Sequence, residues 1–237
     1  SSSFTVGLLN SLLEYKKNKI SKKNLLEKAI YVERILNKEN VGSQDQTSAT
    51  YGGLNHIKFN KNGKIIINKI NLNKKDLKNF QQKFMLFHTG IFRIADKITK
   101  TYVDKLQVKY AELDKIKNHV NHAIKYLYDK QFDSFGNLLD ETWHHKRQIS
   151  KNISNSTIDE IYKIAIDNGA LGGKLLGAGG GGLILFYVPE NSQQKLIKKL
   201  SKLTYIPFKI SFEGSRIIYN SNNKFINELK IKNLNNK

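Results

Sequence analysis

The sequence contains no cysteine, and this absence excludes a disulfide framework and any metal site built on thiolates. It is compatible with a reducing cytoplasm, the compartment that we expect. Proline is limited to two residues and methionine to one, Met85. Long apolar runs are also missing, because the longest, at residues 183–188, is far shorter than the ~18 residues of a membrane-spanning helix. We therefore expect no membrane partner.

Acidic residues are scarce beside basic ones: 20 aspartates and glutamates face 40 lysines and arginines, which gives a net charge of +20. Such an excess first indicates nucleic-acid binding. Only four of these cations are arginines, however, the residue favoured for bidentate contacts with phosphates and bases. The lysines are spread along the chain among asparagines and isoleucines. We therefore interpret them as solvated charge and expect no nucleic-acid partner.

Helical and extended hydropathy patterns alternate along the chain. Helical periods cover residues 1–17, 21–36, 91–105, 112–128, 132–147, 157–168 and 192–203. Strand patterns cover residues 54–59, 65–67, 84–87, 183–188, 207–212 and 217–219, with a hairpin turn at Asn62-Gly63. Residues 37–53 are predicted to be a loop and residues 74–82 a polar connector. This mixture of helices and largely non-alternating strands predicts an α+β fold.

Glu33 is an acidic residue on the apolar face of a predicted helix. On a helical wheel it lies between Leu26 and Ala29, inside an apolar arc that also contains Ile35 and Leu36. An inward carboxylate needs a cation or several hydrogen-bond donors, because burying it alone is prohibitively costly. A pairing with a lysine at the helix edge and a role as metal ligand both meet this need.

Asp45 lies in a segment of small and polar residues, Gly-Ser-Gln-Asp-Gln followed by Thr-Ser-Ala-Thr-Tyr-Gly-Gly. Small neighbours let a substrate approach, and Gln44 and Gln46 are placed to orient the carboxylate. Such a carboxylate is suited to act as a general base toward a substrate hydroxyl. A helix N-cap or an ordinary loop aspartate is the structural alternative.

The most distinctive feature is the glycine run Gly-Ala-Gly-Gly-Gly-Gly at residues 177–182. It matches G-x-G-x-x-G by letter, but a dinucleotide-binding turn follows a strand and opens a helix. Here we expect the reverse order, with a helix before the run and a strand after it. The run is therefore interpreted as a flexible loop whose amides approach a phosphate or shape the wall of a site, with a structural turn as the alternative.

Two histidine pairs give weaker signals. His119 and His122 are three residues apart on a predicted helix, a spacing that suits a metal, but no third ligand is evident and solvated histidines are favoured. The second pair, His144-His145, precedes two cations. It is equally compatible with an exposed basic turn and with a phosphate-facing role.

Together these segments resemble the galactokinase, homoserine kinase, mevalonate kinase and phosphomevalonate kinase (GHMP) superfamily. The opening Ser1-Ser2-Ser3 resembles the end of its phosphate-loop motif, and Leu-Leu-Gly-Ala-Gly-Gly-Gly-Gly at residues 175–182 resembles its third motif. Four further segments, at residues 44–53, 87–90, 143–147 and 169–174, look like the heptose 7-phosphate 1-kinase branch. Where that branch tends to have serine before an arginine, this chain has Phe92.

The resemblance implies a two-domain GHMP kinase fold with ATP and Mg²⁺ as cofactors. Residues 1–80 would be the C-terminal part of the ATP-binding domain, and residues 81–237 a ferredoxin-like C-terminal domain. The chain opens without methionine and holds only the end of the phosphate loop. We therefore expect it to be a portion of a longer protein and to be inactive alone, since phosphoryl transfer depends on positioning the triphosphate.

The resemblance also implies roles for single residues. Asp45 would be the base at the anomeric hydroxyl, and Ser2 and Glu33 would be the Mg²⁺ ligands. The triphosphate would lie against Ser1, Ser2, Ser3, Gly177, Gly179, Gly180 and Gly181. The sugar phosphate would contact Gln44, Thr89, Arg93, Lys146, Arg147 and Lys174.

The implied reaction is ATP-dependent phosphorylation of D-glycero-D-manno-heptose 7-phosphate at its anomeric hydroxyl, toward activated heptose and surface polysaccharide. The alternatives are a fucokinase-like or other sugar 1-kinase, a non-catalytic sugar sensor, and a basic nucleic-acid-binding domain. A sensor has no need of both Glu33 and Asp45, so the presence of both argues against it. The oligomeric state is left open, with a homodimer among the options.

Overall fold

The computed structural model describes residues 2–92, 98–99 and 109–220, and the chain divides into two compact units. The first unit joins the residues up to Lys69 with those from Ser211 onward, and the second contains the residues from Ile70 to Ile210. The chain thus returns to its first unit at the end. The division between residues 80 and 81 that we expect from the sequence refers to the two domains of the kinase family. It is not tested by these two compact units and stays a prediction.

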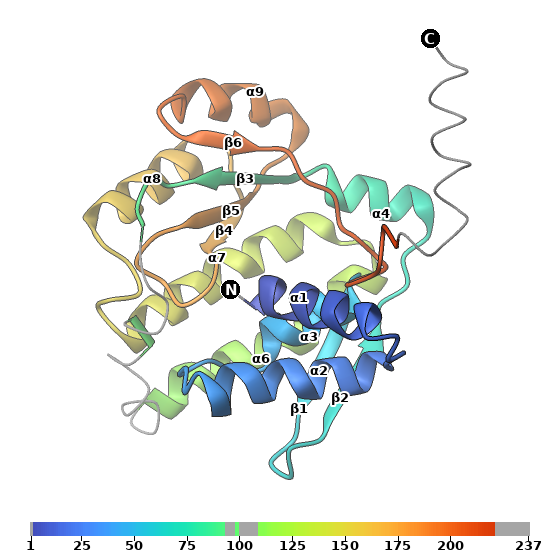
Figure 1. Cartoon of the computed structure of the whole chain (residues 1–237). Helices are drawn as coiled ribbons and strands as arrows, with labels where there is room; N and C mark the ends of the chain where they lie inside the picture. The colour runs from blue at the N-terminus through green and yellow to red at the C-terminus, as the bar shows by residue number, and fades with distance from the viewer. Residues whose placement is uncertain (1, 93–97, 100–108, 221–237) are drawn as a thin grey trace. The chain divides into compact units, whose positions relative to one another are not determined.

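The first unit consists of helices and one hairpin (Figure 1). Its elements are α1 (Ser2–Tyr15), α2 (Lys22–Tyr31), the π-helical segment η1 (Val32–Leu36), α3 (Gln44–Tyr51), β1 (Asn55–Phe59) and β2 (Ile65–Lys69). Ser21 caps α2, and its side chain accepts a hydrogen bond from the Asn24 amide. Val6, Leu25 and Ala29 form a small buried core between α1 and α2.

The hairpin of the first unit also follows the prediction. Strands β1 and β2 pair antiparallel, with Ile57 opposite Ile67. Gly63 in the turn has φ of 80°, a left-handed conformation that glycine adopts without strain. The Asn-Gly signal therefore locates the turn correctly.

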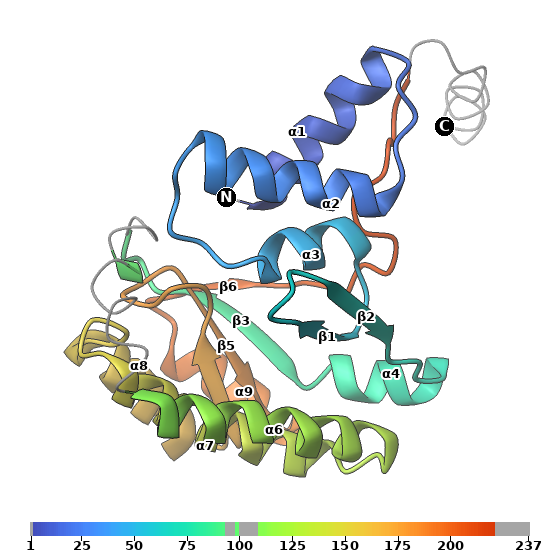
Figure 2. The ribbon, with the colours of Figure 1, turned by 90° about the horizontal axis from the view of Figure 1, so that it is seen from below.

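The second unit is a four-stranded antiparallel sheet with helices on one face (Figure 2). Its strands are β3 (Phe84–His88), β4 (Gly172–Leu175), β5 (Leu183–Tyr187) and β6 (Thr204–Ile206), in the order β4-β5-β3-β6. Its helices are α4 (Lys74–Gln81), α6 (Tyr110–Tyr128), α7 (Phe132–Ile149), α8 (Ser156–Asp167) and α9 (Glu190–Lys199). The α+β prediction is confirmed.

The main hydrophobic core of the second unit lies between this sheet and its helices. Alternate strand residues point into the core, Met85 and Phe87 from β3 and Ile184 and Phe186 from β5, as the two-residue period of a strand requires. Trp143 of α7 is fully buried against them. No helix in the part of the chain that the structure describes combines the length and apolar character needed to cross a membrane.

Two segments that the sequence predicts to be irregular are helices. Residues 44–51, predicted as part of a loop, form α3, and residues 74–81, predicted as a connector, form α4. Neither segment has a continuous apolar stripe, the signal on which the prediction depended. Local side-chain contacts accompany both helices: Asn73 caps α4, and the Thr47 and Thr50 hydroxyls donate to carbonyls four residues earlier, those of Ser43 and Gln46.

The strand predictions also need correction near the glycine run and the C-terminus. The run is preceded by strand β4, not by a helix, so it joins two antiparallel strands. Gly172 and Gly173 at the start of β4 lack the branched side chains that signal a strand. Among the described residues the last strand is β6, and residues 207–220 contain none. The predicted helix at residues 91–105 lies largely outside the described residues.

Candidate active site

Glu33 is buried in the first unit and accepts hydrogen bonds from two residues that are distant in sequence. Its side chain is 2% exposed. The hydroxyl of Ser2, the first residue of α1, donates to Glu33 Oε2 at 2.8 Å. The side-chain amide of Gln46, on α3, donates to the same oxygen. Three elements therefore meet at one carboxylate, and Ser2 and Glu33, the two residues that the resemblance assigns to Mg²⁺, are hydrogen-bonded to each other. Their role as metal ligands stays a prediction.

The backbone at Glu33 has a π-helical turn, which the sequence did not predict. Within η1 the bonding pattern widens, and the Asn37 amide bonds the Val32 carbonyl, five residues back. Glu33 stays on the inner face because the preceding helix α2 is regular. After Glu33 the wider turn rotates the following side chains away from the predicted apolar face. Ile35 and Leu36 are therefore 58% and 60% exposed. Such π turns occur frequently at functional sites.

One oxygen of this buried carboxylate has no donor. Among the described residues, Glu33 Oε1 has no hydrogen-bond partner, and no lysine, arginine or histidine forms an ion pair with Glu33. A buried carboxylate without a counter-charge is costly, so the site is suited to an added cation. A carboxylate oxygen beside a serine hydroxyl is the hard-oxygen donor set that Mg²⁺ prefers. The residues present therefore fit this ion.

Asp45 lies next to Gln46 in the first turn of α3, but its side chain is exposed. Consecutive helical residues point in different directions, so Gln46 reaches Glu33 while Asp45 remains open to solvent. Gln44 and Ser3 are also exposed. Sequence reasoning assigned Gln46 to Asp45 and missed its bond to Glu33, because α3 itself was not predicted.

The glycine run forms a tight loop between β4 and β5 in the second unit. Gly177, Gly179, Gly180 and Gly182 all have positive φ values. A Cβ at Gly181 would lie 2.7 Å from the Ile91 carbonyl oxygen. These conformations and contacts explain why glycine occupies most of the run. The two ends of the loop line a cavity of about 250 Å³ together with His88, Ile91 and Phe92.

Two residues that are predicted to bind substrate also hold this loop in place. The buried Thr89 hydroxyl donates to the Gly182 carbonyl at 2.9 Å and lies 3.1 Å from the Gly182 amide, which donates to it. Lys146 Nζ donates to the Gly177 carbonyl at 2.8 Å. Thr89 and Lys146 thus hold opposite ends of the loop.

Replacing Thr89 with valine should therefore destabilise the second unit by about 1–2 kcal/mol, because the isosteric change removes both hydroxyl contacts with Gly182. Chemical denaturation would measure this loss. The exposed Thr157 on α8, changed to valine, is the matched control. A Thr89→Val protein of unchanged stability that binds sugar phosphate more weakly would contradict this structural role and support the substrate-binding role predicted from the sequence.

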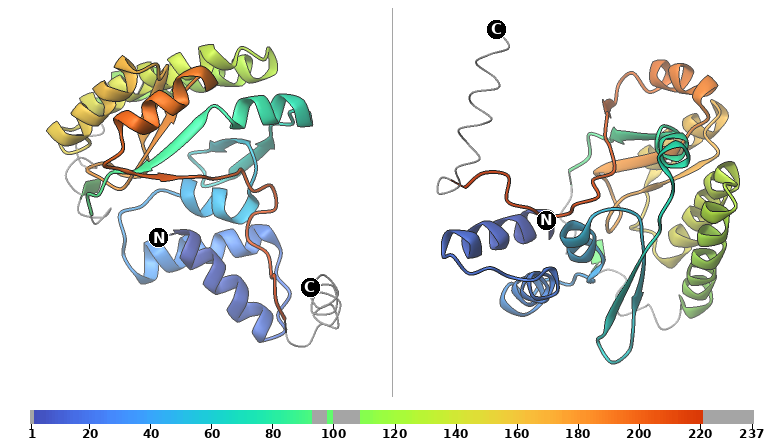
Figure 3. Two further views of the ribbon diagram at one scale, coloured as in Figure 1. Left: turned by 90° about the horizontal axis from the view of Figure 1, so that it is seen from above. Right: turned by 90° about the vertical axis from the view of Figure 1, so that its right-hand side faces the viewer.

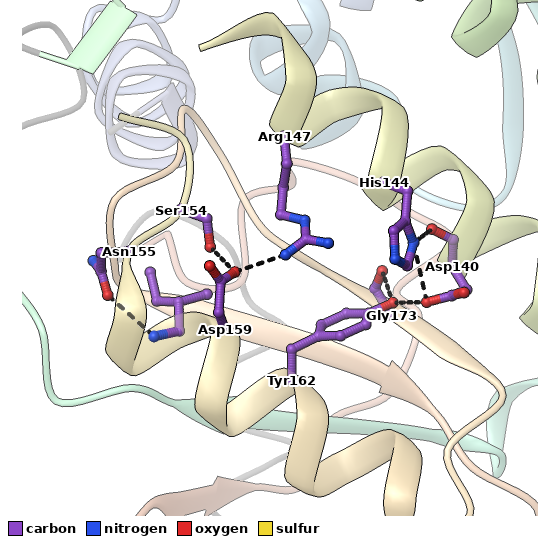
Figure 4. A network of polar contacts seen from close by, with 9 residues as sticks. Asp140, His144, Arg147, Ser154, Asn155, Asp159, Tyr162 and Gly173 are labelled. Carbon is purple, nitrogen blue, oxygen red and sulfur yellow. Dashed lines mark hydrogen bonds and ion pairs between the residues drawn. The ribbon is translucent and has the colours of Figure 1, made fainter. Parts of the chain in front are cut away.

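Arg147 is held within a polar network on α7 and α8 (Figure 4). It forms an ion pair with Asp159 at 2.9 Å, and the Ser154 hydroxyl donates to the same carboxylate oxygen at 2.7 Å. In the same network the Tyr162 hydroxyl donates to Asp140, and burial, together with this carboxylate, raises the pKa of Tyr162. The charge of Arg147 is thus already compensated, which makes a contact with substrate less favourable.

The other predicted residues are more simply placed. Lys174 is half-buried on β4, opposite Leu185 of β5. Ser1 and Arg93 lie outside the described residues. The structure therefore joins Ser2 to Glu33 in the first unit, and Thr89 and Lys146 to the glycine loop in the second.

One histidine of each pair makes a contact between α6 and α7. His119 Nδ1 lies 2.8 Å from the Thr142 hydroxyl, and burial lowers the pKa of His119. His145 pairs with Glu112 at 2.6 Å, and this hydrogen bond lowers the pKa of the Glu112 carboxyl. Within the described ranges, no group of three or more histidine, aspartate or glutamate side chains is placed to hold a metal. His119 and His145 thus each contact a side chain of the neighbouring helix.

Comparisons with known proteins agree with this architecture. Residues 123–206 match the family described as GHMP kinases C terminal. The chain is 31% identical over 208 residues to D-glycero-alpha-D-manno-heptose 7-phosphate kinase of Campylobacter jejuni, a match covering 85% of this chain and 60% of that protein. It is 28% identical over 208 residues to mevalonate kinase of Methanocaldococcus jannaschii, covering 85% and 61%. The chain thus spans about 60% of the length of these relatives.

Solved structures share the fold. A D-glycero-D-manno-heptose 1-phosphate kinase from Bacteroides thetaiotaomicron superimposes with a TM-score of 0.72 at 21% identity, covering 92% of this chain and 63% of that one. The mevalonate kinase of Methanococcus jannaschii superimposes with a TM-score of 0.64 at 23% identity, covering 86% and 61%. At these identities the likeness concerns the fold alone.

Proposed function

Because this chain carries a GHMP kinase C-terminal domain within a GHMP kinase fold, we propose that it is part of an ATP-dependent sugar 1-kinase. The proposed substrate is a heptose 7-phosphate, phosphorylated at its anomeric hydroxyl. The 31% identity to a kinase named for that substrate supports the choice of substrate. The whole reaction also requires the first half of the phosphate loop.

The observation that carries the proposal is the bond between Ser2 and Glu33. These residues are 31 positions apart, and the family resemblance assigns both to a Mg²⁺ site. They are hydrogen-bonded and buried, and one carboxylate oxygen lacks a donor. A purely structural glutamate would more simply have a lysine or arginine as its partner.

The proposed chemistry divides between positioning and proton transfer. Bound Mg²⁺ would neutralise charge on the transferring phosphoryl group, and Ser2 and Glu33 would hold it. Asp45 is exposed, so its carboxylate is accessible to accept the proton of the sugar's anomeric hydroxyl. Four glycines of the loop at residues 177–182 have positive φ values, a backbone conformation that phosphate-binding turns also use. The amides of Gly180 and Gly182 already donate to the carbonyls of Ile153 and Ile91.

Substrate preference tests the proposal. In a protein with the complete phosphate loop, kcat/KM should favour heptose 7-phosphate over free heptose by at least about tenfold. This ratio corresponds to one charge-assisted hydrogen bond to the 7-phosphate, which contributes about 1.5 kcal/mol. The assay compares heptose 7-phosphate, free heptose and L-fucose with ATP and Mg²⁺. A preference for either unphosphorylated sugar would reject the proposed substrate, and a preference for fucose would favour a fucokinase-like enzyme.

A further inference from the structure

A segment near the C-terminus lies against the end of α3 in the first unit. We call residues 211–215 the strap. The Gly53 amide donates to the Ser211 carbonyl at 2.7 Å, and the Ser215 amide donates to the Ala49 carbonyl at 2.8 Å. In Figure 3 the red segment passes the end of the light-blue helix α3. Two backbone bonds thus join parts of the chain that are more than 150 residues apart in sequence.

The contact depends on a close approach of two glycines. Gly52 and Gly214 have φ values of 65° and 66°, in the left-handed region that favours glycine. A Cβ on Gly214 would overlap the Thr50 carbonyl oxygen, and a Cβ on Gly52 would overlap the Gly214 amide nitrogen. Any other residue at either position would therefore push the strap away from α3.

Lys22, at the start of α2, connects the strap and the helix. Its Nζ donates to the Glu213 carbonyl at 2.6 Å and to the Tyr51 carbonyl at 3.4 Å. Tyr51 is the last residue of α3, where carbonyl groups lack partners within the helix and a cation is favourable. Lys22 therefore caps α3 and fixes the strap to it with one side chain.

The opposite end of α3 carries the residues of the proposed site. Asp45 and Gln46 are its second and third residues, and the Gln46 amide must reach Glu33 on η1. Backbone hydrogen bonds link the two ends of this eight-residue helix, so we expect a shift at its C-terminal end to displace Gln46 and Asp45 as well. We propose that the strap and Lys22 form a positioning device that sets Asp45 and Gln46 relative to Glu33. Its catalytic importance rests on the proposed function.

The decisive experiment is Lys22→Met in the 237-residue chain, with Lys23→Met as the matched control. Lys23 is the next residue on α2, is exposed, and pairs only loosely with Glu27 at 3.9 Å. Two NMR readouts apply: the proton shift of the Gln46 side-chain amide and the exchange rates of the backbone amides of α3. For Lys22→Met we expect the Gln46 signal to move toward that of an exposed glutamine. We also expect exchange in α3 to accelerate about threefold to tenfold.

Gly214→Ala is the second variant, and Gly63→Ala is its control. Gly63 has a similar φ of 80° but open space around its Cα, so it separates backbone strain from the steric contact. Gly214→Ala should reproduce and exceed the effect of Lys22→Met, while Gly63→Ala should leave both signals of α3 and Gln46 unchanged. If Gly214→Ala does not fold, Lys22→Met decides alone.

Unchanged Gln46 and α3 signals in Lys22→Met would overturn the positioning device. These readouts need neither metal nor sugar, so they stand even if Glu33 does not bind Mg²⁺. In a protein with the complete phosphate loop, Lys22→Met should also lower kcat and leave the KM for sugar unchanged. If Lys22→Met displaced the NMR signals of Gln46 and α3 but left kcat unaltered, the strap would have a structural role only. That result would overturn its proposed role in catalysis.

Discussion

Replacing Asp45 with asparagine is expected to lower kcat by about 10²–10⁴-fold, the usual contribution of a positioned general base. Asparagine has the same shape but cannot accept the proton of the sugar hydroxyl. The side chain is exposed and lies at the start of α3, so the change should leave the fold and sugar binding intact. Steady-state kinetics in a protein with the complete phosphate loop would measure kcat and KM separately.

The exposed Asp129, changed to asparagine, controls for loss of one negative charge. It should keep the parental kcat. If Asp45→Asn also kept a near-normal kcat, Asp45 would be an ordinary residue of the first helical turn, and the proton acceptor would have to be sought elsewhere.

Replacing Glu33 with glutamine is expected to raise the Mg²⁺ concentration needed for half-maximal activity by at least about tenfold. Even residues that only support a metal ligand typically contribute 10–100-fold to affinity. The unfolding midpoint without metal should be equal or higher, because a buried amide costs less than a buried charge without a counter-ion. Mg²⁺ should stabilise the parent protein and not the variant.

Glu27→Gln is the matched control for this change. Glu27 lies on the preceding helix α2, is exposed, and forms an ion pair with Lys23 at 3.9 Å. It should alter neither the Mg²⁺ requirement nor the response of the unfolding midpoint to Mg²⁺. A lower midpoint for Glu33→Gln together with an unchanged Mg²⁺ requirement would make Glu33 a structural residue.

The burial of Glu33 could be predicted from sequence because the helical period shows which residues share the apolar face of an amphipathic helix. Leu25, Leu26 and Ala29 are buried as expected, and Glu33 lies with them. The partners of Glu33 were predictable only in part. Ser2 followed from the resemblance to a family motif, whereas Gln46 depends on a helix without an apolar stripe, which hydropathy periods do not detect.

Tertiary contacts also explain what the sequence could not indicate in the second unit. A lysine and an arginine at residues 146 and 147 look alike as phosphate ligands in a sequence. In the structure one bonds the glycine loop and the other pairs with Asp159, twelve residues later. Such pairings depend on how α7, α8 and the loop pack, so local sequence patterns do not predict them.

The position of the new phosphate tests the central proposal most directly. A protein with the complete phosphate loop would be incubated with heptose 7-phosphate, ATP and Mg²⁺, and the product examined by ³¹P NMR. We expect a bisphosphate whose new phosphorus couples to the proton on the anomeric carbon. Transfer to any other hydroxyl, or no transfer to a sugar, would contradict assignment as a sugar 1-kinase.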